Sequence, residues 1–353
     1  MNICFIINDW NTINPATETT LCLIHESCIR NHNVGILYPR NLTIRNNVTY
    51  GFVKLIIKKK RYSENFRIFH KKVAFKEQLL PIGGFDAIFV RKNPPLDNTM
   101  LNFLDSVKDD TFIVNDINGM RKANNKLYTT TFNDPGNTFL PVTHVSKNKE
   151  YLRKIINESL SDKMILKPLN SYGGHGVIVL EKRAQQNINS LLDFYIGETG
   201  EKQYVIMQEF IEGAEKGDIR VLLLNGKIIG AYGRVPAQGD IRCNIHAGGS
   251  AQKHTLTLRE QEICKKIGPK LVSDGLFFVG VDLINEKLIE VNVISPGGIV
   301  NINRLSKVRL QKKVINFIEE KVQEKEEARS DREYALKRRL ASKLEIINAE
   351  THF

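Results

Sequence analysis

The stretch VGVDLINEKLIEVN, residues 279–292, decides the fold, because it predicts two apolar β-strands joined by a tight Asn-Glu turn. Glu290 and Asn292 lie two residues apart on the second strand and project from the same face, and Asp282 can face them from the first. Three such oxygen ligands suit Mg²⁺, which also takes phosphate oxygens of a nucleotide. Polar residues at this spacing also mark the solvent face of an ordinary strand, but the Ser-Pro-Gly-Gly turn that follows favours a metal site.

A second motif, ILKPLNSYGGHG at residues 165–176, predicts a strand ending in Lys167 and a glycine-rich turn into another strand. Gly173, Gly174 and Gly176 would let backbone amides approach a phosphate, and the lysine adds a point charge. The motif is not a P-loop, since the lysine precedes the glycines and no GK[ST] follows. Taken alone, it fits an ordinary glycine-rich hairpin equally well.

Between these motifs lies a spaced set of arginines, Arg220, Arg234 and Arg242. Asp218 and Arg220 share one face of a predicted strand. Each arginine alone would be interpreted as a surface residue. Because arginine recognises carboxylates through two parallel hydrogen bonds, their place between a phosphate loop and a metal triad predicts anion recognition.

The first third of the chain alternates strands with a helix and predicts a parallel α/β sheet. A helix over residues 18–31 places Leu21, Ile24 and Cys28 on one face. The segment between Leu42 and Leu80 fits no single pattern. Strands are expected at residues 2–7, 34–38, 86–91 and 112–115.

Two further units are predicted, one beginning near Arg121 and the other near Tyr204. In the last unit, Thr257 and Glu260 form a capping box that opens a helix reaching to residue 274. From residue 319 the chain is densely charged with both signs, which predicts a solvated helix or a frayed tail. The other expected elements are a helix at 148–159 and strands at 163–167, 177–180, 204–209, 219–224, 227–232, 277–284 and 287–292.

Composition limits the class of protein. A length of 353 residues suits two or three packed units, and no apolar run approaches the roughly 18–20 residues of a membrane span. The start, MNICFIINDW, lacks a basic leader and is interpreted as a first strand. Five scattered cysteines without metal or redox spacing favour free thiols in a reducing cytoplasm.

The net charge of +12 is concentrated between residues 54 and 76. A solvated surface is the simplest interpretation, and nucleic-acid binding is the alternative. Nucleic acid is not expected, since no zinc finger, aromatic RNA-binding strand or helix-turn-helix pattern is found. The cluster comprises Lys58, Lys59, Lys60, Arg61, Arg67, Lys71, Lys72 and Lys76.

The order of these motifs resembles the bacterial glutathione synthetases, which are ATP-grasp ligases. The similarity covers most of residues 1–305, and its most diagnostic segments are RKNPP at 91–95 and RCNIHAGG at 242–249. Shorter matching segments are VN at 114–115, NKL at 125–127, GDIRV at 217–221, IGP at 267–269 and FVGVD at 278–282.

The resemblance implies an α/β protein with an N-terminal parallel-sheet (pre-ATP-grasp) domain followed by a two-part ATP-grasp fold. The expected units are an N-terminal substrate-side domain at 1–120, an ATP-grasp lid at 121–203, a C-terminal ATP-grasp subdomain with the metal site at 204–318, and a charged helical tail at 319–353.

The resemblance also implies site residues. ATP would be bound by Lys126, Lys167, Gly173, Gly174, Gly176, Gln208, Glu209, Ile211 and Asp218. Mg²⁺, or Mn²⁺, would be bound by Asp282, Glu290 and Asn292. The substrates would contact Arg91, Asn93, Arg220, Arg242, Asn244, Ser295, Gly297 and Gly298, and the catalytic cations at the acyl phosphate would be Arg220, Arg234 and Arg242.

The activity that this implies is ligation of γ-glutamylcysteine with glycine through an acyl phosphate, shielded from water by the segment 235–250, in a cytoplasmic homo-oligomer. Two departures bear on the substrates. The segment after the metal strand reads SPGGI where the bacterial enzymes commonly have a threonine and a small residue or cysteine, and Glu209 stands where some relatives have an amide. A ligase for another carboxylate and amine, and a catalytically silent nucleotide-binding or nucleic-acid-binding protein, are the alternatives.

Overall fold

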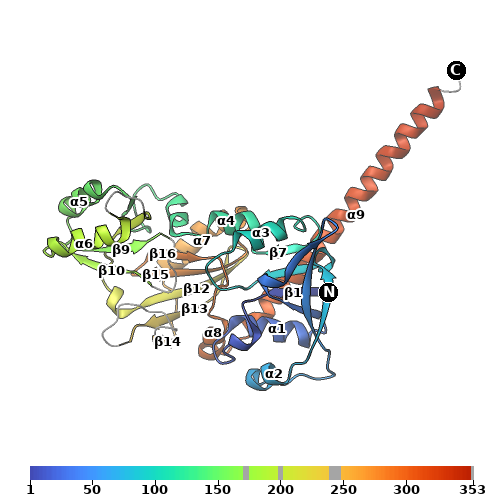
Figure 1. Ribbon diagram of the computed structural model, residues 1–353, viewed down its shortest axis with the longest axis horizontal. Helices are drawn as coiled ribbons and strands as arrows, with labels where there is room; N and C mark the ends of the chain where they lie inside the picture. The colour runs from blue at the N-terminus through green and yellow to red at the C-terminus, as the bar shows by residue number, and fades with distance from the viewer. Residues whose placement is uncertain (170–174, 198–201, 238–247, 351–353) are drawn as a thin grey trace.

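The computed structural model describes residues 1–169, 175–197, 202–237 and 248–350 of the chain. Three β-sheets form its framework, and helices cover them (Figure 1). A mixed α/β architecture with an N-terminal sheet and two further sheets agrees with the predicted fold class.

The N-terminal sheet has a parallel centre, as the alternation of strands and helices predicts. Its strands follow the order β2-β1-β6-β7 and all pair in parallel. Parallel strands end at the same edge of the sheet, so residues that follow β6 and β7 lie next to each other. The bounds are β1 Asn2–Ile6, β2 Asn33–Leu37, β6 Ala87–Val90 and β7 Phe112–Val114, with helices α1 Thr19–Ile29, α3 Asn98–Asp105 and α4 Ile117–Lys122.

The segment that fits no single pattern extends this sheet with antiparallel strands. Side chains on β4 alternate between buried and exposed positions, as Val53 and Phe52 illustrate, because an antiparallel sheet can leave one face to water. The eight cations of the basic cluster are all exposed. The elements are β3 Leu42–Arg45, β4 Val48–Ile56, α2 Phe66–Lys72 and β5 Phe75–Pro81.

The second sheet is a four-stranded antiparallel sheet in the order β10-β9-β11-β8. It packs on two helices and has a core of its own, which includes Leu152, Leu166, Leu192 and Met207. Strand β11 pairs with β9 in this sheet, so the sheet includes residues up to Glu209. The elements are β8 Thr143–Ser146, α5 Lys149–Glu158, β9 Lys163–Pro168, β10 Ile178–Glu181, α6 Gln185–Ile196 and β11 Val205–Glu209.

The third sheet is antiparallel and has the order β14-β13-β12-β15-β16. Its covering helix α7, Leu258–Ser273, begins at the capping box that the sequence predicts, with both hydrogen bonds between Thr257 and Glu260 present. The strands are β12 Asp218–Leu224, β13 Lys227–Val235, β14 Ser250–Gln252, β15 Phe278–Ile284 and β16 Lys287–Asn292.

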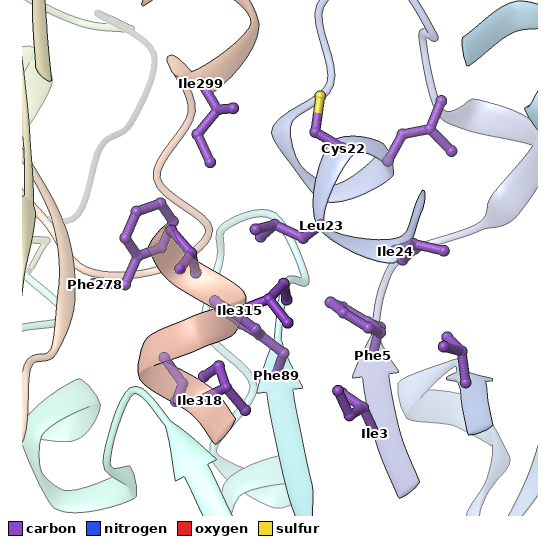
Figure 2. Packing of buried hydrophobic residues seen from close by; sticks show 14 of the residues in the cluster. Ile3, Phe5, Cys22, Leu23, Ile24, Phe89, Phe278, Ile299, Ile315 and Ile318 are labelled. Atoms are coloured by element: carbon purple, nitrogen blue, oxygen red, sulfur yellow. The ribbon is translucent and has the colours of Figure 1, made fainter. Parts of the chain in front are cut away.

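One hydrophobic core joins the first and third sheets. Figure 2 shows Phe5 and Phe89 of the N-terminal sheet close to Phe278, Ile299 and Ile315 from the last part of the chain, and all five belong to one buried cluster. These two sheets therefore form one packed body. Two helices complete it, α8 Ile299–Ser306 and α9 Leu310–Glu350.

Helix α9 begins well before the charged tail expected at residue 319. Its first turns are buried, including Leu310, Val314 and Val322, because apolar residues recur there at helical spacing. The helix then leaves the body and extends away from it (Figure 1). The charged composition thus marks the part of the helix that leaves the core.

Candidate functional site

The candidate site lies where the three sheets meet. Strand pairing builds its centre: Arg220 on β12 lies opposite Asp282 on β15, Asp282 lies opposite Glu290 on β16, and Asp218 lies opposite Arg234 on β13. Directly opposed residues in antiparallel strands have side chains on the same face. The order of strands in the third sheet therefore gathers five of the predicted site residues.

Asp282 is the centre of a buried network of charges. Arg220 donates to both of its carboxylate oxygens, with Nη2 2.8 Å from Oδ2, and Arg234 Nη2 lies 2.9 Å from the same Oδ2. Arg234 also binds both oxygens of Asp218. Burial raises the pKa of Asp282, but the two arginines outweigh it and hold that pKa well below its usual range. Asp282 is therefore ionised and engaged by two cations.

The pKa of Asp218 moves the other way. Burial raises it, and the negative charge of Asp282 raises it further, although Arg234 opposes both effects. Two carboxylates and two guanidinium groups thus share one buried network in which each charge has an opposite neighbour. Such a network holds the arginines in fixed orientations.

The other two expected metal ligands lie beside this network and are more accessible. Glu290 Oε1 lies 3.0 Å from Lys126 Nζ, and the Asn292 amide donates to Asp282 Oδ2 at 3.0 Å. Glu290 and Asn292 present oxygen atoms of the kind that Mg²⁺ prefers, so they fit the metal. Asp282 fits less directly, because its oxygens already accept from two arginines. Within the described ranges, no three His, Cys, Asp or Glu side chains are placed to hold an ion by themselves.

Lys167, at the end of β9, is the most buried lysine of the site. Its Nζ donates to Gln208 Oε1 at 2.7 Å, and the Gln208 amide donates to Thr143 Oγ1 at 2.8 Å. Burial lowers the pKa of Lys167 to about 8, with Glu290 opposing and Lys126 adding to the shift. Among the described residues, Lys167 is thus held by one neutral hydrogen-bond partner, and no carboxylate forms an ion pair with its Nζ.

The remaining nucleotide-side residues lie along β11. Glu209 Oε2 accepts from the backbone N–H of Val142 at 2.9 Å, and Ile211 is buried just beyond the strand. At the lid turn, Gly176 has a φ of +72°, and a Cβ there would lie 2.8 Å from the Pro168 ring. This position therefore requires glycine. The predicted residues Gly173, Gly174, Arg242 and Asn244 lie outside the described residues.

The substrate-side residues lie at the edge where β6 ends. Arg91 is 2% exposed and donates from Nη1 to the carbonyl oxygen of Pro296 at 3.1 Å. Ser295 Oγ donates to the carbonyl oxygen of Arg91 at 3.2 Å. Gly297 is half-buried, with its carbonyl oxygen 3.3 Å from Arg220 Nη1, and the N–H of Asn93 binds Asn8. The structure thus brings Arg91 and the segment 295–298 together.

Two further residues, Asn115 and Thr19, bind the backbone around the site and had no role assigned from the sequence. Asn115, directly after β7, uses its amide to bind the carbonyl oxygens of Phe278 and Val293 at 2.8 and 2.7 Å, and its Oδ1 accepts from Phe278 N at 2.7 Å. Thr19 Oγ1 accepts from the N–H groups of Gly298 and Ile299. The Val-Asn dipeptide was noticed as a matching segment, but no local pattern distinguishes either residue from an ordinary loop or helix start.

A cavity opens beside the expected metal ligands Glu290 and Asn292, and Pro94 and Lys126 also line it. It lies between the end of the metal strand and the short helix that carries Lys126 (Lys126–Thr131). One cation, Lys126, and the oxygen-bearing side chains of Glu290 and Asn292 line one space here, which suits a phosphate with a bound divalent ion.

Family models match both parts of the chain. The model described as "Prokaryotic glutathione synthetase, N-terminal domain" matches residues 1–121, and "Prokaryotic glutathione synthetase, ATP-grasp domain" matches residues 125–307. A curated glutathione synthetase from Synechocystis is 33% identical over 332 residues, covering 90% of this chain and 99% of the relative. One from Gloeobacter violaceus is 31% identical and covers 91% and 97%.

Solved structures agree in fold. A D-cycloserine synthetase superposes with a TM-score of 0.61 at 12% identity, covering 92% of this chain and all of that one. The D-alanine–D-alanine ligase from Coxiella burnetii gives a TM-score of 0.56 at 11% identity, covering 94% and 98%. No helix in the part of the chain that the structure describes has the length and apolar character needed to cross a bilayer.

Proposed function

The chain belongs to the prokaryotic glutathione synthetase family and is an ATP-dependent carboxylate–amine ligase, and we propose that it joins γ-glutamylcysteine to glycine. The resemblance stated from the sequence and the enzyme class are thereby confirmed. The products would be glutathione, ADP and phosphate. The observation that carries the proposal is the meeting of Lys126, Arg220 and Arg234 with Glu290 and Asn292 in one site.

The proposed reaction has two balanced steps. A carboxylate oxygen of γ-glutamylcysteine attacks the γ-phosphorus of ATP, and ADP leaves. The glycine nitrogen then attacks the acyl phosphate carbon, phosphate leaves with the bonding electrons, and the amine gives up a proton. Since phosphoryl transfer asks mainly for positioning and charge neutralisation, a site without a nucleophilic side chain suits it.

We assign the phosphates to Lys126 and Lys167, covered by the loop that contains Gly173, Gly174 and Gly176. The base and ribose would lie against Gln208, Glu209 and Ile211. Asp218, at the start of β12 in the third sheet, would contact the nucleotide from the other side. Lys167 supports this assignment, because its hydrogen-bond partner in the described part of the chain is the neutral Gln208, and an anionic phosphate would balance its charge.

Negative charge on the acyl phosphate would be stabilised by Arg220, Arg234 and Arg242. Two of these arginines are oriented by Asp282 and Asp218, so they need not reorganise during the reaction. When bound, Mg²⁺ or Mn²⁺ would neutralise phosphate charge. Glu290 and Asn292 would hold it with nucleotide oxygens, and Asp282 would complete the set.

The carboxylate and the amine are the least constrained part of the proposal. The Ser-Pro-Gly-Gly segment departs from the bacterial pattern at the place expected to meet them, so another peptide or amino acid pair is the second candidate. The four described free cysteines, all buried, support a reducing compartment, for which we propose the cytoplasm, and we propose a homo-oligomer.

The test is release of phosphate from ATP and Mg²⁺, with γ-glutamylcysteine and glycine each omitted in turn. Release that needs both, with glutathione detected by mass spectrometry, supports the proposal. Release with neither compound, or none despite ATP binding, contradicts the substrates and keeps the ligase class. Arg242→Ala should mainly weaken use of the dipeptide, and an effect confined to ATP affinity would remove Arg242 from the substrate side.

A further inference from the structure

Arg91 is a buried cation with one unsatisfied donor, and the described residues form no ion pair with it, although the charge of Glu18 favours its protonated form. Its side chain is 2% exposed, and its Nη2 is the one buried side-chain polar atom without a hydrogen-bond partner among the described residues. Burial lowers its pKa to about 10, which still leaves it charged at neutral pH. An unpaired buried cation is costly, so its presence needs a reason.

The bonds that Arg91 does make connect two distant parts of the chain. Nε donates to Thr20 Oγ1 at 3.1 Å, at the start of α1, and Nη1 donates to the carbonyl oxygen of Pro296 at 3.1 Å. The guanidinium also lies 5.8 Å from the ring centres of Phe89 and Phe278. Arg91 therefore holds the segment after the metal strand against the N-terminal sheet, with an aromatic ring on each of two sides.

The neighbouring contacts hold the same segment. Thr19 Oγ1 accepts from Gly298 N at 3.1 Å and from Ile299 N at 3.2 Å, and Arg220 Nη1 lies 3.3 Å from the Gly297 carbonyl oxygen. Gly298 has a φ of +133°, which a side chain would strain. Residues 295–298 are thus fixed from both the N-terminal domain and the third sheet.

Gly297 is the part of this segment that faces open space. Among the described residues, no atom outside the two chain neighbours lies within 4 Å of the position a Cβ would take there, while those neighbours, Pro296 and Gly298, are buried. Open space beside a fixed backbone allows a small ligand to approach the main chain closely. The Arg91 guanidinium that holds this segment is itself buried and binds the carbonyl oxygen of Pro296.

We propose that Arg91 is a positioning residue, which acts through the Ser295–Gly298 segment to shape the site for the carboxylate of the amine substrate. It does so without touching that substrate. The sequence assigned Arg91 to substrate contact, and its burial and its bonds give it the indirect role instead. The identity of the amine rests on the proposed function.

Two variants test this role. Arg91→Lys keeps a cation but loses the planar guanidinium with its several donors. Thr19→Val removes the hydroxyl oxygen that accepts from the N–H groups of Gly298 and Ile299. Arg121→Lys is the matched control, since the contacts of Arg121 in the described structure are with Asn102, Asn118 and Asp105, at a partly exposed position away from this segment. Wild type and all three variants are first compared for thermal unfolding and for binding of Mg²⁺ with a non-hydrolysable ATP analogue.

The first readout needs no substrate. Hydrogen exchange of the ligand-free protein should be faster by about tenfold at the amides of residues 297–299 in both Arg91→Lys and Thr19→Val, and unchanged in Arg121→Lys. Equal exchange in wild type and Arg91→Lys overturns the proposal. This readout remains decisive if wild type makes no glutathione, which would contradict the proposed function alone.

The second readout is kinetic. In Arg91→Lys and Thr19→Val, the KM for glycine should rise by about tenfold or more, with kcat and the KM for ATP within about threefold. A raised KM without faster exchange means that Arg91 touches the substrate, which overturns the proposal. A uniform loss of ATP-analogue affinity and thermal stability means a purely structural role and overturns it as well.

Discussion

Lys126 Nζ lies 3.0 Å from Glu290 Oε1, so a cation expected to bind phosphate neutralises a carboxylate expected to bind metal in the ligand-free protein. Asp282, the third expected metal ligand, is also neutralised by cations, because its oxygens accept from Arg220 and Arg234. A carboxylate that already has a cation beside it attracts a second cation poorly. If Lys126 binds phosphate as we propose, the nucleotide phosphates would draw it away from Glu290 and would supply further oxygen ligands for the metal.

We therefore expect the metal to bind together with the nucleotide and not before it. Mn²⁺, followed by electron paramagnetic resonance, should bind weakly to the protein alone and at least about tenfold more tightly with a non-hydrolysable ATP analogue, after binding to the free analogue is subtracted. Equally tight binding of Mn²⁺ without nucleotide would contradict this order.

Glu290→Ala should abolish turnover and preserve the fold. Glu290 is a partly exposed side chain that we propose as a metal ligand and that fills no core volume, so we expect a loss of at least about 100-fold in kcat and a change in stability below about 1 kcal/mol. The measurement is phosphate release at saturating Mg²⁺, with urea unfolding as the control for folding. Undiminished turnover would remove Glu290 from the metal site.

Much of the fold could be predicted because the strands carry strong local patterns. The pair of strands around Asp282 and Glu290 was placed correctly, since apolar alternation and a two-residue turn are local signals. The antiparallel strands between Leu42 and Leu80 were not, because β4 pairs with β2, β3 and β5, and which strands pair depends on contacts far apart in the sequence.

The structure brings several of the predicted site residues together, but their geometry could be predicted only in part. Spacing along β16 indicated that Glu290 and Asn292 share a face, but nothing local indicated that Asp282 would be bound by Arg220 and Arg234. That arrangement follows from the pairing of β12 with β13 and β15. The same reason explains why Asn115, whose partners are more than 160 residues away, received no role.

Binding of ATP should weaken as the pH rises through about 8. The pKa of Lys167 in the ligand-free protein is lowered to about 8 by burial, so the lysine loses its proton above that pH and no longer attracts phosphate. If only the protonated form binds well, the Kd of a non-hydrolysable analogue rises by up to about tenfold per pH unit above this value.

The same shift predicts that a proton is taken up on binding near pH 8, because a bound phosphate favours the charged lysine. Calorimetry in buffers of different ionisation enthalpy measures this uptake. Lys167→Arg, which stays protonated, serves as the control and should show neither the uptake nor the pH dependence. A pH-independent Kd in wild type would contradict the assignment of Lys167 to the phosphates.

Asn115→Ala should destabilise the body formed by the first and third sheets. The Asn115 side chain is buried and bonds three backbone groups, Phe278 N, Phe278 O and Val293 O, which have no water to replace it. Leaving buried polar groups unpaired costs about 1–3 kcal/mol each, so we expect a loss of roughly 3 kcal/mol or more in the free energy of unfolding. The measurement is the urea midpoint with an unchanged slope.

Asn118→Ala is the control. At an exposed position three residues further on, it should change stability by less than about 0.5 kcal/mol. Equal midpoints for the two variants would mean that Asn115 does not join the sheets.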